Sequence, residues 1–244
     1  MNKKTSKRLV VFDFDHTFVQ DNTDMVVFDM IQSSEAKQAL WNQYEKGKWT
    51  NFMNEVFDYL YNNKFTLNEM KMKLKNMKIV DGMLELFEFL KANSHIFDCI
   101  IVSDSNQWFI ESILEVQGLR SIIKHIFTNK ATIQNGKLHV LNCHSHSHSA
   151  CPVNMCKGQL LMEYKDEMLK SGTNYISVCY IGDGSNDYCP CERLHSNDYV
   201  FARKDYPLEK KISSSSTLST KNILAKCAFW VSGVDILHEI KHLI

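Results

Sequence analysis

The sequence lacks a surplus of charge, because its 28 Lys and Arg residues are balanced by 28 Asp and Glu residues. Without extra cations to neutralise backbone phosphates, general binding of nucleic acid is not expected. Proline and glycine are also scarce, at 3 and 9 of 244 residues, which argues against long flexible linkers. The length and the hydrophobic content of 44% fit one large globular domain or two smaller ones.

Long apolar runs are missing as well. The most apolar stretches, such as residues 8–12, end far short of the roughly 20 residues that a membrane-spanning helix needs. No apolar signal region precedes residue 8, so neither a membrane nor secretion is expected. The sequence therefore predicts a cytoplasmic protein whose 8 cysteines are free thiols or metal ligands rather than a disulfide framework.

Short apolar runs alternate along the chain with segments of helical period. Buried strands are expected at residues 9–12, 99–102 and 176–181, with weaker candidates at 199–202 and 227–231. Between these runs, apolar residues recur at helical spacing, and two of the predicted helices end at a glycine, Gly118 and Gly172. This alternation is typical of an α/β fold with a parallel sheet and crossover helices.

Residues 21–81 interrupt the alternation. They contain two amphipathic patterns, one at residues 52–61 and one at 67–77. Some sixty residues are far more than the ~2–6 residues of an ordinary strand-to-helix loop. We therefore expect a small helical cap at 21–81 on a core made of residues 1–20 and 82–244; the alternative is a long crossover with ordinary core helices.

Acidic residues follow the predicted strands where those strands end. Asp13 and Asp15 follow the first strand, Asp104 follows the second, and Asp183 and Asp187 follow the third. The strands of a parallel sheet end at the same edge, so these carboxylates should meet there. Clustered carboxylates repel one another unless a cation neutralises them, and oxygen-only ligands suit Mg²⁺. The alternative is that each aspartate only caps the helix that follows it.

Such a cluster could carry out phosphoryl transfer. A carboxylate held next to Mg²⁺, such as Asp13, can attack phosphorus and form an aspartyl-phosphate. A second acid two residues on, Asp15, can protonate the leaving oxygen and later activate water. Ser103 would supply a hydroxyl, and Lys157 would supply positive charge for the phosphoryl oxygens. The predicted reaction is hydrolysis of a phosphomonoester.

These residues resemble the four motifs of the haloacid dehalogenase superfamily. The run Asp-Phe-Asp-His-Thr at residues 13–17 resembles its first motif, and Ser103 and Lys157 match its second and third. The run Gly-Asp-Gly-Ser-Asn-Asp at residues 182–187 resembles its fourth motif. All four occur in the order and strand context of the superfamily.

The resemblance implies roles for four residues of these motifs: Asp13, Asp15, Thr17 and Asp183. Asp13 is expected to be the nucleophile and Asp15 the general acid and base. The resemblance also implies Mg²⁺ held by Asp13, the main-chain oxygen of Asp15, and Asp183. We add Asp187 to the metal site and place Thr17, a positioning residue in the superfamily, in the substrate site.

The likeness extends to one family of small-molecule phosphatases. Residues 12–24, 102–106, 151–157 and 180–190 resemble the phosphoethanolamine/phosphocholine phosphatase family, which has relatives acting on pyridoxal phosphate. The resemblance implies a Rossmann-like core with a helical cap, and a small phosphorylated metabolite as the partner. Phosphoethanolamine or phosphocholine is the predicted substrate, and pyridoxal phosphate is the alternative.

Two acids beside the motifs, Asp24 and Asp104, point to an amine on the substrate. Carboxylates next to an anionic phosphate are costly unless a positive charge offsets them, and an ammonium on the substrate would supply it. In the resembling family, aspartates at the matching positions are implicated in recognising the amino-alcohol end. The alternative is that Asp104 caps the next helix and Asp24 is a solvated residue of the cap.

The run at residues 143–156 is rich in histidine and cysteine. His148, Cys151 and Cys156 are ligand types that Zn²⁺ prefers, and His148 stands where the resembling family often has a cysteine. The spacing matches no standard zinc finger, and alternating His and Ser are also typical of a polar surface loop. A non-catalytic zinc-binding protein on the same fold is therefore the alternative to an enzyme.

Overall fold

The computed structural model describes residues 5–215 and 223–244, which form seven strands, ten α-helices and two short 3₁₀ helices. The strands are β1 (Thr5–Phe12), β2 (Phe97–Asn106), β3 (Ile123–Gln134), β4 (Lys137–Leu141), β5 (Thr173–Gly182), β6 (Tyr199–Arg203) and β7 (Lys226–Trp230). The helices are α1 (Thr23–Phe28), α2 (Ser34–Gln43), α3 (Trp49–Asn62), α4 (Leu67–Lys75), α5 (Met83–Ala92), α6 (Gln107–Val116), η1 (Arg120–Ile122), α7 (Lys157–Lys170), η2 (Ser185–Asp187), α8 (Tyr188–Glu192), α9 (Pro207–Ser215) and α10 (Gly233–Lys241).

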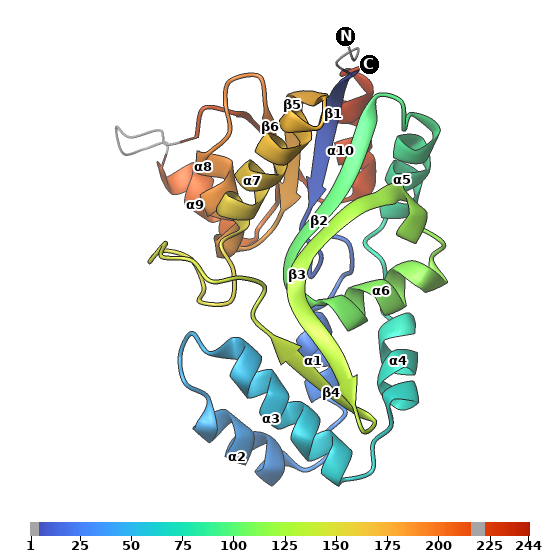
Figure 1. Cartoon of the computed structure of the whole chain (residues 1–244), viewed down its shortest axis with the longest axis vertical. Helices are drawn as coiled ribbons and strands as arrows, with labels where there is room; N and C mark the ends of the chain where they lie inside the picture. Colours follow the sequence, from blue (N-terminus) through green and yellow to red (C-terminus); the bar gives the residue numbers. More distant parts are fainter. Residues whose placement is uncertain (1–4, 216–222) are drawn as a thin grey trace.

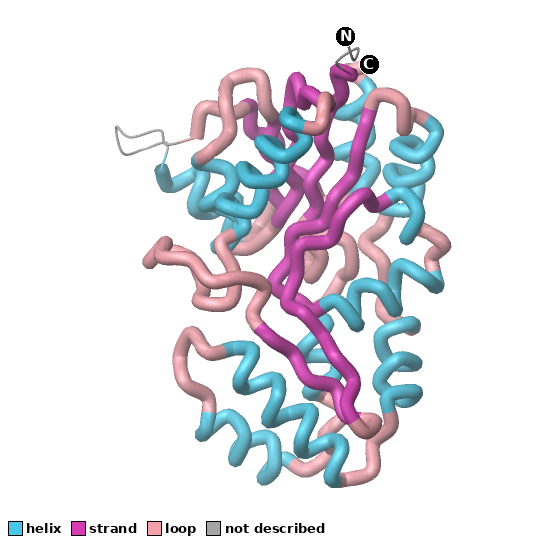
Figure 2. The backbone as a smooth tube through the Cα atoms, in the orientation of Figure 1, coloured by secondary structure: helices cyan, strands magenta, loops and turns pink. Residues whose placement is uncertain are grey.

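The seven strands form one sheet in the order β4-β3-β2-β1-β5-β6-β7. All neighbouring strands are parallel except β3 and β4, which form an antiparallel hairpin (Figure 2). The central strand β1 pairs with β2 on one side and with β5 on the other. The carboxyl ends of these three strands therefore lie side by side, at the edge where open α/β sheets bind ligands.

Alternating side chains of β1 build two separate cores. Val10 and Phe12 point to the face covered by α5, α6 and α10, and the Phe12 and Phe87 rings lie 4.6 Å apart between centroids. Leu9 and Val11 point to the opposite face, which α7, α8 and α9 cover (Figure 1). Side chains alternate between the two faces of any strand, so a continuous apolar run buried on both faces is what a central parallel strand requires.

Helices α1 to α4 lie between β1 and α5 in the sequence and form the lower part of the molecule in Figure 1. The β3–β4 hairpin reaches into this part and packs against α3. The side chain of Asn54 on α3 exchanges two hydrogen bonds of 2.8 Å with the backbone of Val140 on β4. The hairpin therefore joins the sheet to the helices, whereas the cap boundaries at 21–81 stay a prediction.

The predicted α/β class and the parallel sheet are confirmed. The predicted strands coincide with β1, β2, β5, β6 and β7 to within a few residues, and the two amphipathic patterns coincide with α3 and α4. Strands β3 and β4 were not predicted, because many of their side chains are exposed and they lack a continuous apolar run. In the described residues, no helix has both the length and the hydropathy that crossing a bilayer requires.

Candidate active site

Three aspartates meet at the carboxyl edge of the sheet. Asp13 directly follows β1, Asp183 directly follows β5, and Asp187 ends the short helix η2. All three are almost fully buried, and each has a carboxylate oxygen within 4.8 Å of the others. The backbone hydrogen bond from Asp13 N to Ile181 O, 2.9 Å long, continues the pairing with β5 one residue past the end of β1. The predicted meeting of carboxylates from distant segments is thus present.

Lys157 is buried between two of these carboxylates. It is the first residue of α7, and its Nζ lies 2.8 Å from Asp13 Oδ1 and 2.7 Å from Asp187 Oδ1. Burial alone lowers the pKa of Lys157, but the carboxylates of Asp13 and Asp187 outweigh it and raise the pKa above its ordinary value. The side chain is 1% exposed, so its charge is fixed beside Asp13 with little screening from water.

Asp187 anchors this lysine. Its Oδ1 also accepts a hydrogen bond of 2.7 Å from the Tyr180 hydroxyl, and its Oδ2 accepts from the backbone N–H groups of Asp183 and Gly184. A Cβ on Gly182 would lie 2.6 Å from Asp187 Cγ, so the carboxylate occupies the space that this glycine leaves. With two donors on each oxygen, Asp187 is better placed to hold Lys157 and the turn than to bind a metal directly.

Asp13 and Asp183 accept fewer hydrogen bonds than Asp187 does. Asp13 Oδ1 contacts the Lys157 ammonium, but no described residue gives it a well-aligned hydrogen bond. Burial raises the pKa of Asp13, and the charge of Asp187 raises it further. Burial and Asp187 likewise raise the pKa of Asp183 to about 7, although Thr17 Oγ1 donates a 3.2 Å hydrogen bond to it. Buried oxygen donors whose negative charge is this costly fit a hard divalent cation such as Mg²⁺.

Asp15 is held by the first residue of α1. Thr23 donates two hydrogen bonds of 3.1 Å to this carboxyl, one from its backbone N–H and one from its hydroxyl. Burial raises the pKa of Asp15 well above its ordinary value, and the charges of Asp24 and Asp104 add to the rise. A carboxyl whose pKa is raised by burial is suited to protonating a leaving group.

The predicted substrate residues occupy two neighbouring elements. Asp24 lies in α1 and is 5% exposed, and its Oδ2 accepts a 2.6 Å hydrogen bond from Trp49 Nε1. Burial raises the pKa of Asp24 to about 7 despite this bond. Asp24 is therefore not a solvated residue of the cap. Asp104 does not cap α6, since Asn106 does, and its Oδ2 instead accepts a 2.8 Å hydrogen bond from Asn186.

Ser103 lies near the end of β2, the strand that also carries Asp104, and its hydroxyl is fully buried. Its Oγ accepts a 3.2 Å hydrogen bond from the backbone N–H of Ser105. The hydroxyls of Ser105 and Thr23 are 2.7 Å apart and so link this strand end to Asp15. Asp24, Trp49 and Ser105 also line a narrow crevice between α1, α3 and β2. The predicted catalytic and substrate residues thus approach one another from four segments of the chain.

Sequence reasoning missed several residues that support this site. Arg203, at the end of β6, donates hydrogen bonds to the backbone oxygen of His16 and to the Gln20 side chain, the latter 2.8 Å long. Its guanidinium also lies over the rings of Tyr206 and Trp230, at 4.5 and 5.2 Å from their centroids. His16 has a left-handed backbone with φ 56°, which Arg203 helps to hold. Arg203 lies outside every motif, and Thr23 lies within the run 12–24 but had no role assigned to its side chain.

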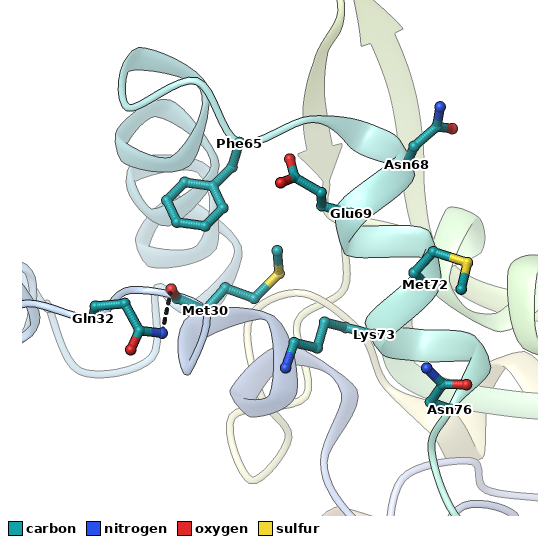
Figure 3. A pocket seen from close by; sticks show the side chains of 8 residues that line it. All are labelled: Met30, Gln32, Phe65, Asn68, Glu69, Met72, Lys73 and Asn76. Atoms are coloured by element: carbon teal, nitrogen blue, oxygen red, sulfur yellow. Dashed lines mark hydrogen bonds between the residues drawn. The ribbon is translucent and has the colours of Figure 1, made fainter.

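A larger hollow of about 460 Å³ lies on the outside of the helical part, between the end of α1 and α4. Figure 3 shows its lining, with Phe65, Met72 and Lys73 around the opening. Glu69 also lines it, but this carboxylate is engaged in capping α4 through Thr66. None of the catalytic candidates lines this hollow, and we assign it no chemistry.

Solved structures with this fold include phosphoserine phosphatases. An apo form has a TM-score of 0.60 at 17% identity, covering 95% of this chain and 98% of the other. A substrate-bound complex has a TM-score of 0.61 at 16% identity, covering 96% and 98%. The fold, together with the aspartate cluster and the buried lysine, defines a phosphatase of the haloacid dehalogenase superfamily.

The family model described as Putative Phosphatase matches residues 8–244, and the chain belongs to this family. The pyridoxal phosphate phosphatase PHOSPHO2 of Homo sapiens is 41% identical over 98% of this chain and 99% of its own length. The phosphoethanolamine/phosphocholine phosphatase of Homo sapiens is 28% identical over 97% of this chain and 89% of its own length. The protein is therefore a phosphoric monoester hydrolase.

Proposed function

We propose that this phosphatase is Mg²⁺-dependent and hydrolyses small cytoplasmic phosphomonoesters through an aspartyl-phosphate on Asp13. The observation that carries the proposal is the buried pair of Asp13 and Lys157, in which a carboxylate oxygen with no well-aligned hydrogen bond contacts a fixed ammonium. Asp13, Asp183 and the main-chain oxygen of Asp15 would hold the metal, with Asp187 beside them. When bound, Mg²⁺ offsets the charge of the carboxylates and of the phosphoryl oxygens.

The residues of the chain divide the reaction between them. Asp13 attacks phosphorus, and the bond from phosphorus to the leaving oxygen breaks while Asp15 gives its proton to that oxygen. Asp15, now a carboxylate, takes a proton from water, which attacks phosphorus and releases phosphate and free Asp13. Lys157 and the Ser103 hydroxyl stabilise the phosphoryl oxygens in both steps. Thr17 positions Asp183 through its hydrogen bond.

The substrate proposal is a phosphate ester that carries a positive charge near its phosphate. Asp24 and Asp104 raise the pKa of Asp15, so both lie close enough to place negative charge beside the leaving group. An ammonium such as that of phosphoethanolamine or phosphocholine would offset this charge. Trp49, whose Nε1 holds Asp24, lies beside Trp41 and Phe52 and could offer an aromatic face to a quaternary amine.

Pyridoxal phosphate is the second candidate substrate. The observation that favours it is the higher identity to relatives named pyridoxal phosphate phosphatase, 41% for the human protein against 28% for the phosphoethanolamine/phosphocholine phosphatase. A pyridinium N–H could also pair with a buried carboxylate such as Asp24. The same acidic surroundings therefore support either substrate, and kinetics must separate them.

A panel of phosphate esters tests the proposal. Phosphoethanolamine, phosphocholine, pyridoxal phosphate, glycerol phosphate and p-nitrophenyl phosphate are compared with metal-stripped enzyme, with and without added Mg²⁺. We expect kcat/KM to be highest for an amine ester and to depend on Mg²⁺ for every ester. A preference for pyridoxal phosphate would support the second candidate, and full turnover after EDTA treatment would contradict the metal assignment.

A further inference from the structure

The structure brings four soft metal ligands together outside the active-site cluster. His148, Cys151, Cys156 and Cys189 each offer one atom, and these atoms all lie within 4.8 Å of one another. The first three belong to the histidine- and cysteine-rich run of the sequence, whereas Cys189 lies on α8, more than thirty residues later. The sequence did not indicate Cys189, because folding alone brings it beside the other three. We propose that these residues bind a structural Zn²⁺.

Four of the six distances between these atoms are close to those around a tetrahedral ion, and the other two are at most 4.8 Å. The sulfurs of Cys151 and Cys156 are 3.6 Å apart, and those of Cys156 and Cys189 are 3.7 Å apart. His148 Nδ1 lies 3.0 Å from Cys151 Sγ and 3.8 Å from Cys189 Sγ. Sulfurs bound to Zn²⁺ at ~2.3 Å stand about 3.7 Å apart at the corners of a tetrahedron, and an imidazole nitrogen stands slightly closer. The four side chains are thus arranged as ligands around one centre.

The backbone around the four residues supports this arrangement. A 3.1 Å hydrogen bond from Cys151 N to His148 O closes a turn that brings these two side chains together. Cys156 caps the N-terminus of α7, and its sulfur accepts a 3.4 Å hydrogen bond from Gln159 N. Such N–H groups stabilise a thiolate, which is the form of cysteine that binds zinc.

The charge of the site is also compensated. Zn²⁺ with three thiolates and one neutral imidazole carries a net charge of about −1, which is costly in a partly buried position unless a cation offsets it. Arg193 donates a hydrogen bond to the Cys189 sulfur and supplies that cation. A Cβ on Gly158 would lie 2.7 Å from both Cys189 Sγ and Arg193 Nε, so this glycine leaves the space that the pair occupies.

The position of the tetrad gives the zinc a role in the architecture of the active site. Cys156 immediately precedes Lys157, and Cys189 follows Asp187 by two residues. The Lys157–Asp187 ion pair of 2.7 Å therefore joins the same two segments that a zinc ion would join. In Figure 1, the loop from β4 reaches the start of α7 on the side where α8 lies. Zinc would brace the lysine from outside, with no contact to the substrate.

Zinc content tests this inference without any reference to activity. The protein is expressed in zinc-supplemented medium, transferred to metal-free buffer and analysed by atomic emission. We expect about one zinc ion per wild-type chain, released when an organomercurial titrates the thiols. Cys189→Ser should lose this zinc. Cys143→Ser, which changes a cysteine of the same run that is not part of the tetrad, should keep it.

Cobalt provides a second measurement that does not depend on the fold of one variant. Co²⁺ bound to the wild type should show a sulfur-to-cobalt charge-transfer band and the strong ligand-field bands of a tetrahedral ion, and His148→Ala should weaken both. The inference is overturned if the wild type carries no more zinc than Cys189→Ser. It is equally overturned if peptide mapping finds a disulfide between Cys151 and Cys156, or between Cys156 and Cys189, in zinc-free native protein.

Discussion

Replacing Asp24 by Asn tests how much folding free energy is lost when this buried carboxyl, which we propose recognises the substrate, becomes ionised. Burial raises the pKa of Asp24 from 3.8 to about 7, so the folded protein binds this proton more tightly than the unfolded chain does. The stability that this group contributes is therefore complete below about pH 4 and is lost as the pH rises to about 7. Asn has the same shape, keeps an oxygen to accept the hydrogen bond from Trp49, and has no such proton to lose.

The magnitude follows from the shift. A rise of about 3 pH units corresponds to about 4 kcal/mol, of which roughly 2 kcal/mol falls between about pH 5.5 and about pH 8. We expect Asp24→Asn to gain that much stability relative to the wild type between these two pH values, or about 4–8 °C in Tm. The assay is urea or thermal unfolding at both pH values. Asp21→Asn is the matched control, because Asp21 is exposed and lies three residues away.

The same variant should lose binding of amine substrates. In the wild type, KM for phosphocholine should fall as Asp24 ionises between about pH 6 and about pH 8. In Asp24→Asn this fall should be absent, while KM for p-nitrophenyl phosphate changes alike in both proteins. An identical stability difference at the two pH values would refute the buried, ionisable Asp24, and an unchanged KM for phosphocholine would refute its role in recognition.

The remaining predictions concern three residues around the nucleophile. Asp15→Asn should lower kcat on alkyl phosphates by about 10²–10⁴-fold and on aryl phosphates by much less, since an aryl leaving group needs no proton; equal losses on both esters would contradict a general acid. Lys157→Met leaves Asp13 and Asp187 facing each other without the ammonium and should cost about 3–5 kcal/mol in urea unfolding at neutral pH; a loss under about 1 kcal/mol would mean that the carboxylates do not need this cation. Gly182→Ala should cost about 1–3 kcal/mol and lower kcat, because its Cβ would meet Asp187; a variant with wild-type Tm and kcat would show that the close approach is not rigid.

The sequence predicted the centre of the fold because the central strands have a strong local signal. Residues 9–12 form an apolar run with both faces buried, and the acid that ends the run is also the start of the site. Strands β3 and β4 have no such signal, because many of their side chains are exposed. These segments are strands because β3 pairs with β2 and with β4, and because β4 packs on α3. Propensity alone does not resolve elements of that kind.

The site was predicted as far as its motifs extend. Asp13 and Asp183 come together because parallel strands end at one edge of a sheet, and Lys157 reaches them from the start of α7. The roles of Thr23, Tyr180 and Arg203 could not be predicted, because each role depends on which side chain the folded backbone places beside it, and no sequence pattern encodes that. Cys189 was missed for the same reason, since its partners in the tetrad lie on another segment.

Trapping the phosphoryl group on the chain tests the assignment of Asp13 as the nucleophile. Borohydride reduces an aspartyl-phosphate to homoserine, so enzyme treated during turnover and digested to peptides can be read by mass spectrometry. We expect homoserine at position 13, present only with substrate and absent in Asp13→Asn, which should keep its fold and lose nearly all turnover. Modification at another residue, or steady phosphate release by Asp13→Asn, would contradict the assignment of Asp13 as nucleophile.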